Sequence, residues 1–249
     1  VPGLLTLYAQ NVDNVDAIHL ANIYGTQQWQ HQQQSNNNSD NFNPRPNINN
    51  NNSGYFGGQQ QHQQQQNRSQ RRNDGQDEAR MLSGEISKLK NKRDVPGLLD
   101  LYAQNVDNVN TIHLANIYGT LAKEVRGSDN VEKLKTDETF KGLLESTIEK
   151  LQSTQEWFDV RGIATITHSL GKLKISDERF FNEIEKLRKT IAKEGEPQAL
   201  SNIVWAYATV GCESAELFKV VAGEYERIAK NGKVQELSNI TWAFAKLEC

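Results

Sequence analysis

A polar residue, an aromatic ring and, in most copies, a lysine recur together at intervals of about 37 residues in the C-terminal part of the chain. The two clearest sets are Asn202-Trp205-Thr209 and Asn239-Trp242-Lys246. An Asn amide can hydrogen-bond to the edge of a nucleobase, a Trp ring can stack on its face, and a Lys ammonium can pair with a phosphate. This pattern favours a surface that contacts an extended ligand at regular intervals.

Two earlier sets, Thr165-His168-Lys172 and Asn116-Gly119-Lys123, precede these at offsets of 37 and a further 49 residues. We call the three places in each set the Asn position, the ring position and the Lys position. The candidate ligand-binding row consists of Asn116, Lys123, Thr165, His168, Lys172, Asn202, Trp205, Asn239, Trp242 and Lys246.

Each residue type in this row also has a purely structural interpretation. Trp205 and Trp242 can wedge between neighbouring pairs of helices, and the Asn side chains can tie adjacent helices together by hydrogen bonds. A Lys at the C-terminal end of a helix interacts favourably with the helix dipole and needs no ligand for that. These alternatives stay open at the level of the sequence.

Helical repeats must position the row. Leu200-Ser201-Asn202-Ile203 returns as Leu237-Ser238-Asn239-Ile240, and each such stretch is followed by a second amphipathic one with helical spacing, such as Phe181, Ile184, Leu187 and Ile191. We therefore predict an all-α fold, a right-handed α-solenoid of helix pairs about 37 residues long. The extra residues of the first unit are expected in a surface loop around 127–130.

The faces of the first helix follow from the same spacing. Leu200, Ile203, Tyr207 and Val210 fall on one side and are expected in the core, and Ala206 and Ala208 are small enough for a close helix approach. Asn202, Trp205 and Thr209 lie opposite them. Ser176-Asp177-Glu178 should begin a second helix, and Gly195-Glu196-Pro197 and Asn231-Gly232 should separate units.

Four segments are expected along the chain. Residues 1–26 nearly copy residues 95–120 and lack the continuation of that copy, and residues 27–76 are rich in Gln and Asn and should be disordered. Residues 77–94 should form a charged helical lead-in. Residues 95–249 should form the repeat domain, which stops partway through a repeat and is expected to be truncated at its C-terminal end.

Charge and composition limit the possible functions. The chain has a net charge of −3, and residues 95–249 contain 19 Lys and Arg against 23 Asp and Glu, so an anion-binding surface must be a sorted face. Cys212 and Cys249 lie 37 residues apart, at equivalent repeat positions, which fits a reducing compartment better than a disulfide. No apolar run approaches the ~18 residues that span a bilayer.

Catalytic and metal-binding motifs are not evident. The sequence has no phosphate-binding Gly-rich loop and no paired His residues at metal-ligand spacing. The five His residues are scattered between the duplicate, the Gln-rich segment and one repeat helix. We therefore expect no catalytic residue, metal or cofactor, and no enzymatic activity from this chain.

The segments LSNIVWAYATVG (200–211) and LSNITWAFAKL (237–247) resemble octotricopeptide repeats, whose first helix has a Leu-Ala-Asn-x-x-Trp-Ala-x-Ala pattern. They are also similar to the helical-repeat domain of RNA-editing substrate-binding complex proteins. The first two units depart from the pattern, because Gly119 and His168 replace Trp.

This resemblance implies single-stranded RNA binding along the aligned first helices, a role in RNA processing, stability or translation in a mitochondrion or plastid, and partner proteins in an RNA-processing complex. The alternative that the residues leave open is a peptide-binding or scaffold solenoid, which the acidic balance of the repeat domain favours.

Overall fold

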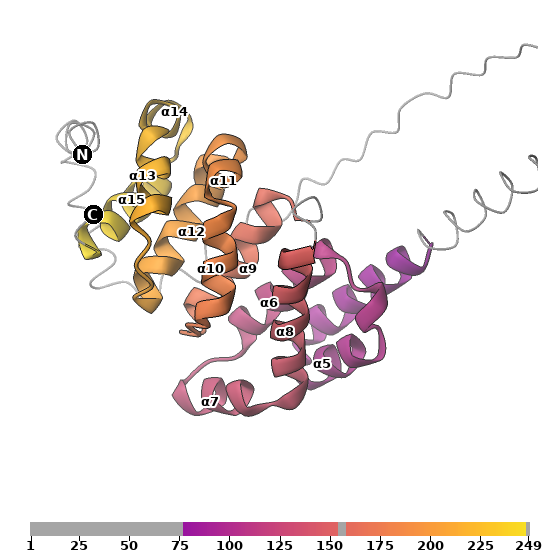
Figure 1. The fold of residues 1–249 in the computed structure, drawn as a ribbon. Helices are drawn as coiled ribbons and strands as arrows, with labels where there is room; N and C mark the ends of the chain where they lie inside the picture. The colour runs from indigo at the N-terminus through magenta and orange to yellow at the C-terminus, as the bar shows by residue number, and fades with distance from the viewer. Residues whose placement is uncertain (1–76, 154–157, 248–249) are drawn as a thin grey trace, which may run out of the picture.

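The computed structural model describes residues 77–153 and 158–247. The near-copy at 1–26, the Gln/Asn-rich segment and Cys249 lie outside the described residues. Within the described ranges every regular element is a helix and no strand occurs, which confirms the predicted all-α class for this part of the chain (Figure 1).

A helix over 77–92 comes first. The elements that follow are α5 (Val95–Gln104), the short η1 (Val106–Asn108), α6 (Thr111–Glu124), α7 (Ser128–Thr136), α8 (Glu138–Ser153), α9 (Val160–Lys172), α10 (Glu178–Lys186), α11 (Arg188–Glu194), α12 (Pro197–Val210), α13 (Ala215–Gly223), α14 (Tyr225–Asn231) and α15 (Val234–Lys246).

Side-chain caps explain where several of these helices begin. Asp94, Asp159 and Asp177 each accept a hydrogen bond from a backbone N–H of the first turn that has no partner within the helix. Asn110 caps α6 in the same way, and the His113 side chain returns a bond to the backbone of Asn110. Asp177 is the cap that the sequence predicted for α10.

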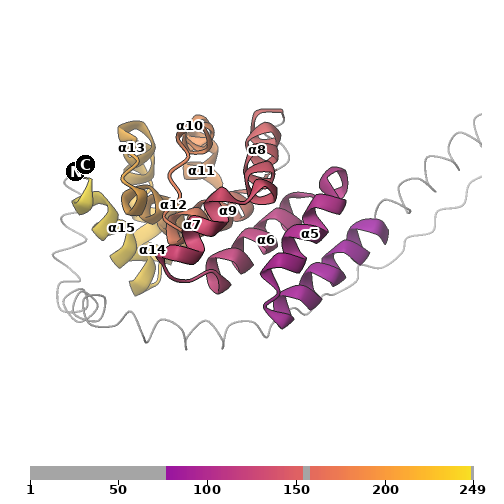
Figure 2. The same cartoon turned by 90° about the horizontal axis from the view of Figure 1, so that it is seen from below.

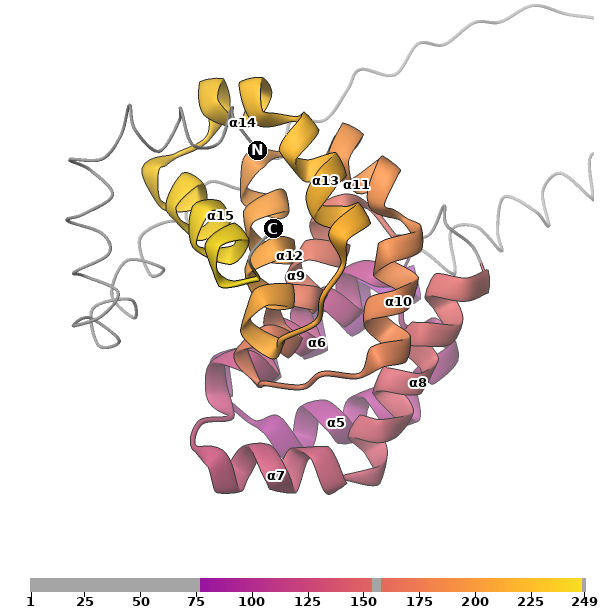
Figure 3. The same ribbon diagram turned by 60° about the vertical axis from the view of Figure 1, so that its left-hand side comes forward.

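The helices form two layers. Helices α6, α9, α12 and α15 pack side by side in succession, with the most extensive contacts between α6 and α9, α9 and α12, and α12 and α15. Helices α8, α10 and α13 form the second layer, which lies along one side of the first (Figures 2 and 3). The first layer therefore contains the four helices in which the sequence places the candidate row.

The core lies between the layers. Leu200, Ile203 and Tyr207 are buried as predicted, whereas Val210, in the last turn of α12, is only half-buried. The Tyr207 hydroxyl donates a 2.6 Å hydrogen bond to the carbonyl of Phe181. Tyr118 on α6 makes the corresponding link to Thr147 on α8, with 3.2 Å between the hydroxyl oxygens. Buried tyrosines thus join the two layers while keeping their hydroxyl groups hydrogen-bonded.

The second helix of the predicted pair is divided in two places. The second stretch of a unit is one helix in α8 but is divided into α10 and α11 at Leu187 and into α13 and α14 at Glu224. At both points the backbone N–H bonds three residues back, to Ile184 and Val221, instead of continuing the four-residue helical pattern. The spacing of apolar residues continues across such a break and does not reveal it.

The extra residues of the first unit form helix α7 instead of the predicted loop. Residues 128–130 are exposed, as expected, but they are the first turn of that helix. Leu134 is buried, and Asp129 in the first turn with Lys133 and Lys135 in the last turn suits the helix dipole. Gly127, with a φ of +84°, makes the turn that precedes α7.

The helix over 77–92 packs against the start of the array. Leu82 and Ile86 are buried, and Nε2 of the buried His113 lies 2.8 Å from Ser83 Oγ and 3.0 Å from the carbonyl oxygen of Ala79. This segment packs on the helices that follow it through apolar contacts and a polar link to α6, and its charged side chains lie on its exposed side.

Candidate nucleic-acid interface

Helices α9 and α12 are almost entirely buried and each exposes one stripe. In α9 every residue is buried except Arg161, Thr165, His168 and Lys172. In α12 the residues that are not buried are Gln198, Asn202, Trp205, Thr209 and, at its end, Val210. Residues spaced by four, three and four lie on one face of a helix. The predicted row is therefore what these two helices present to solvent.

The structure brings the ten predicted row residues onto the four helices of the first layer, and none of them is buried. The exposed members are Asn116, Lys123, Lys172 and Lys246, and the half-buried members are Thr165, His168, Asn202, Trp205, Asn239 and Trp242. Because α6, α9, α12 and α15 pack in succession, equivalent positions follow one another across the layer.

The ring position forms a continuous line of side chains across three helices. The ring centroids of His168 and Trp205 are 4.9 Å apart, and those of Trp205 and Trp242 are 6.4 Å apart with the planes 32° from parallel. The Lys246 Nζ atom lies 5.2 Å from the centroid of the Trp242 ring. The rings contact one another across neighbouring helices, and each keeps part of its surface exposed.

His168 is neutral in this environment. Burial, together with the positive charge of Lys172, lowers the pKa of His168 to about 4. A neutral imidazole stacks as an uncharged ring beside Trp205 and has one donor and one acceptor nitrogen. The ring position of α9 is thus closer in character to the Trp positions that follow it than its residue type suggests.

Three cations meet at the C-terminal ends of α6 and α9. The pKa of Lys172 is lowered by burial and by the positive charges of Arg126 and Lys123. The Arg126 Nε atom donates a 3.0 Å hydrogen bond to the carbonyl of Lys123, which holds the guanidinium at the end of α6. No carboxylate within the described ranges forms an ion pair with any of the three.

A favourable helix dipole accounts for a single Lys at a helix end, but it does not account for three like charges placed close enough to repel one another. Such a cluster is suited to an anion. Arg126 was missed in the sequence because it follows α6 in a connection, where helical spacing carries no information.

The Asn positions are not used to tie the helices together in the described part of the chain. Asn116 donates to the carbonyl of Ile112 and Thr165 to that of Arg161, each within its own helix. The side chains of Asn202 and Asn239 make no hydrogen bond to a described residue. Their amides are therefore available to a ligand.

The exposed stripe continues one turn further toward the helix N-termini than the row predicted from the sequence. Ile112, Arg161, Gln198 and Gln235 each precede the Asn position of their helix by four residues, and all four are exposed. Their offsets of 49, 37 and 37 residues repeat those of the row, and this signal could have found them. We call this the first-turn position.

The sixteen places of the complete stripe hold four cations, Lys123, Arg161, Lys172 and Lys246, and no Asp or Glu. We call these four helix stripes together the first-layer face. Its formal charge is positive although residues 95–249 are acidic overall.

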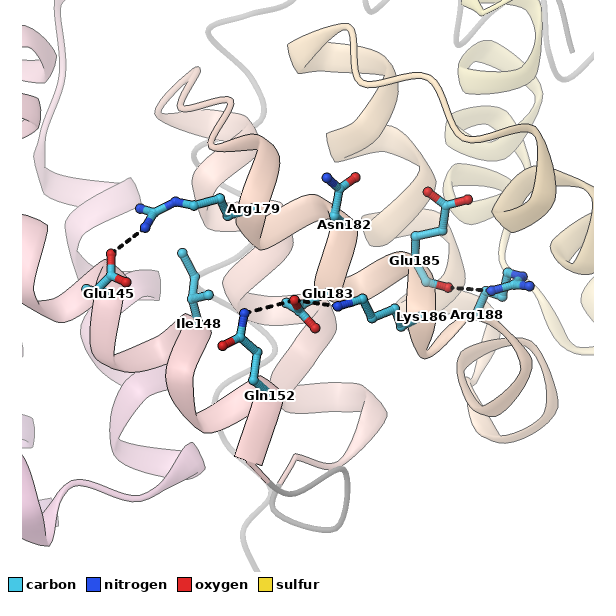
Figure 4. A pocket seen from close by; sticks show the side chains of 9 residues that line it. All are labelled: Glu145, Ile148, Gln152, Arg179, Asn182, Glu183, Glu185, Lys186 and Arg188. Atoms are coloured by element: carbon cyan, nitrogen blue, oxygen red, sulfur yellow. Dashed lines mark hydrogen bonds and ion pairs between the residues drawn. The ribbon is translucent and has the colours of Figure 1, made fainter.

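A groove on the second layer contrasts with this face. It has a volume of about 560 Å³ and lies between α8 and the α10–α11 pair (Figure 4). Four of its six charged side chains pair with one another: Arg179 with Glu145 at 2.7 Å and Lys186 with Glu183 at 2.7 Å, while Gln152 donates to Glu183. Arg188 donates to the backbone carbonyl of Glu185, and its buried Nε atom has no hydrogen-bond partner among the described residues. Three acidic and three basic side chains line it, so it has little net charge to attract an ionic ligand.

Within the described ranges, no three His, Cys, Asp or Glu side chains are grouped so that they could hold a metal ion. None of the described helices is both long and apolar enough to cross a membrane. Compared with models of protein families, with curated proteins and with solved structures, the chain has no significant match. The resemblance to octotricopeptide repeats stays a prediction from its motif residues.

Proposed function

We propose that residues 95–249 form a right-handed α-solenoid whose first-layer face binds single-stranded RNA, as a binding protein without catalytic activity. The observation that carries the proposal is the composition of this face: four cations and no carboxylate beside a line of half-exposed rings, on a domain that is acidic overall. Rings accept bases of any sequence, and unpaired cations meet phosphates.

The local charge pattern favours a nucleic acid over a peptide for this face. A peptide backbone is neutral and gains little from Lys123, Arg126 and Lys172 together, whereas a phosphate of the RNA backbone neutralises their mutual repulsion. A role in mitochondrial or plastid RNA processing, with partner proteins in a complex, is part of the proposal and rests on the motif resemblance alone.

The second candidate is a peptide-binding or scaffold solenoid. The acidic balance of residues 95–249 favours it, and the groove of Figure 4 is lined by the amides of Gln152 and Asn182 and by the buried Ile148. The polar groups of that groove already have internal partners for the most part. We therefore rank this function below RNA binding.

The test is a quadruple variant of the row, Asn202→Ala, Asn239→Ala, Lys172→Ala and Lys246→Ala. Filter binding of a single-stranded RNA pool of random sequence, at several salt concentrations, should give a lower affinity for the variant. The plot of log affinity against log salt should be flatter by about 0.7 for each lost phosphate contact. The melting curve should be nearly unchanged, because none of the four side chains is buried.

A matched control removes the same residue types from places outside the first-layer face: Asn182→Ala, Asn231→Ala, Lys189→Ala and Lys219→Ala, all of which are exposed. This variant should bind RNA as the parent does. Leu200→Ala, by contrast, empties a buried site and should cost about 2–5 kcal/mol, abolishing binding only through unfolding. Unchanged affinity and salt slope in the stable row variant would refute the RNA-binding face.

A further inference from the structure

The side chains at the first-turn position are exposed and free to contact a ligand. The side chains of Ile112, Arg161, Gln198 and Gln235 are exposed, and within the described residues none of them makes a hydrogen bond or an ion pair. Ile112 exposes 67% of its surface, the second largest value among the exposed large apolar side chains of the described ranges. These side chains contribute little to the fold, so folding alone does not explain which residue stands at each place.

The order of positions along each helix sets a direction for a bound strand. From the N-terminal to the C-terminal end, the stripe runs through the first-turn, Asn, ring and Lys positions. Three of the four Lys positions hold a cation, against one of the four first-turn positions, Arg161. A strand that crosses the helices with its phosphates at the Lys positions directs its bases over the rings and toward the N-terminal turns. Base edges then meet the Asn and first-turn side chains.

The side chains at the first-turn, Asn and ring positions differ between the helices, except that α12 and α15 have the same three. α6 offers Ile112 and Asn116 and α9 offers Arg161 and Thr165, whereas α12 and α15 both offer Gln, Asn and Trp. The matching sets are Gln198-Asn202-Trp205 and Gln235-Asn239-Trp242. The two Trp rings are in mutual contact, so the sets are adjacent. Identical side chains at the two sites should give equal free energies of binding for a given base.

We propose that Gln198 and Gln235 read base edges, so that α12 and α15 select the same base at two adjacent nucleotides of a single-stranded RNA. This inference rests on the proposed function and goes beyond it to the residues that determine specificity. An amide has both a donor and an acceptor, and paired hydrogen bonds to one base edge discriminate against other bases by roughly tenfold.

The experiment is a selection from a randomised single-stranded RNA pool with the full chain, read as base enrichment at each position. The parent protein should enrich the same base at two adjacent positions, by roughly tenfold at each. Gln198→Ala should lose the enrichment at one of them and Gln235→Ala at the other. Gln104→Ala, an exposed amide on α5 away from the stripe, should match the parent.

The salt dependence of binding separates this inference from the proposal beneath it. Both Gln variants should keep the parent's salt slope, because they remove no cation. RNA retained with no positional enrichment, or with an enrichment that neither Gln variant alters, would overturn base reading while leaving RNA binding intact. A parent protein that retains no RNA would overturn both.

Discussion

His168 is the residue at which burial, charge and stacking act together. Its ring lies against Trp205. Burial and, to a smaller extent, the positive charge of Lys172 lower the pKa of His168 to about 4. Since the ordinary pKa of a His is about 6.5, the unfolded chain takes up a proton before the folded protein does as the pH falls. The neutral ring is therefore part of what holds α9 and α12 together.

This predicts a pH dependence of stability with a definite sign. The free energy of unfolding should decrease as the pH falls from about 6.5 to about 4. His168→Phe keeps a ring and removes this titration, so its decrease should be smaller. The burial-lowered pKa of His113 acts in the same direction and is present in both proteins, so it cancels in the comparison. Denaturant titrations at several pH values measure the effect, and parallel curves would contradict it.

At the scale of elements, the approach of α9 to α12 depends on a residue without a side chain. A Cβ atom at Gly171 would lie 2.9 Å from the Cα and Cβ atoms of Ala206 and 3.3 Å from a ring carbon of Trp205. Backbone atoms cannot move aside as the end of a flexible side chain can. The contact between these helices, and with it the spacing of the ring positions, is set here.

Two Gly→Ala variants should therefore have opposite effects on stability. Gly171→Ala forces α9 and α12 apart and should cost about 1–3 kcal/mol. Gly142→Ala in α8 has nothing within 4 Å of the new Cβ, so it should gain up to about 1 kcal/mol from helix propensity. Chemical denaturation of both variants measures this. A stabilised Gly171→Ala would mean that the helices do not approach this closely in solution.

The sequence predicts these elements well where the signal is local. The spacing of Leu200, Ile203 and Tyr207 identified the buried side of α12, and Asp177 marked the start of α10. The breaks at Leu187 and Glu224 escaped because the apolar pattern runs through them. The folding of 128–136 into α7 escaped because Gly127-Ser128-Asp129-Asn130 has the composition of a loop.

The candidate site was predictable in part for the same reason. Helical spacing placed the Asn, ring and Lys positions on one side of each helix, which is a property of a single helix. The meeting of Arg126 with Lys123 and Lys172 depends on how α6 packs on α9, and the contacts between the rings depend on how closely the helices approach. Distances between elements are set by tertiary packing, and the sequence pattern does not contain them.

At the scale of the part of the chain that the structure describes, the ion pairs of α8 and α10 and the unpaired cations of the first-layer face lie on different layers. Ion pairs such as Lys141–Glu138, Arg179–Glu145 and Lys186–Glu183 lie on α8 and α10, where acids and bases neutralise each other. The first-layer face retains its cations without such partners. This segregation lets an acidic domain present a positive surface, and an anionic ligand approaching that face meets no opposing carboxylate on it.

The lead-in helix and the segment before it should differ sharply in their importance for stability. Ile86 of the lead-in helix is only 2% exposed. Ile86→Ala should therefore lower the free energy of unfolding by about 2–5 kcal/mol and lower the melting temperature. Deletion of residues 27–73, which contain almost no aliphatic side chain, should leave thermal unfolding nearly unchanged. Melting curves of the parent and both variants, recorded under the same conditions, provide the measurement. A large loss of stability on deleting 27–73 would show that this segment contributes to the core. An unchanged melting temperature for Ile86→Ala would show that the helices after residue 94 do not need the lead-in helix.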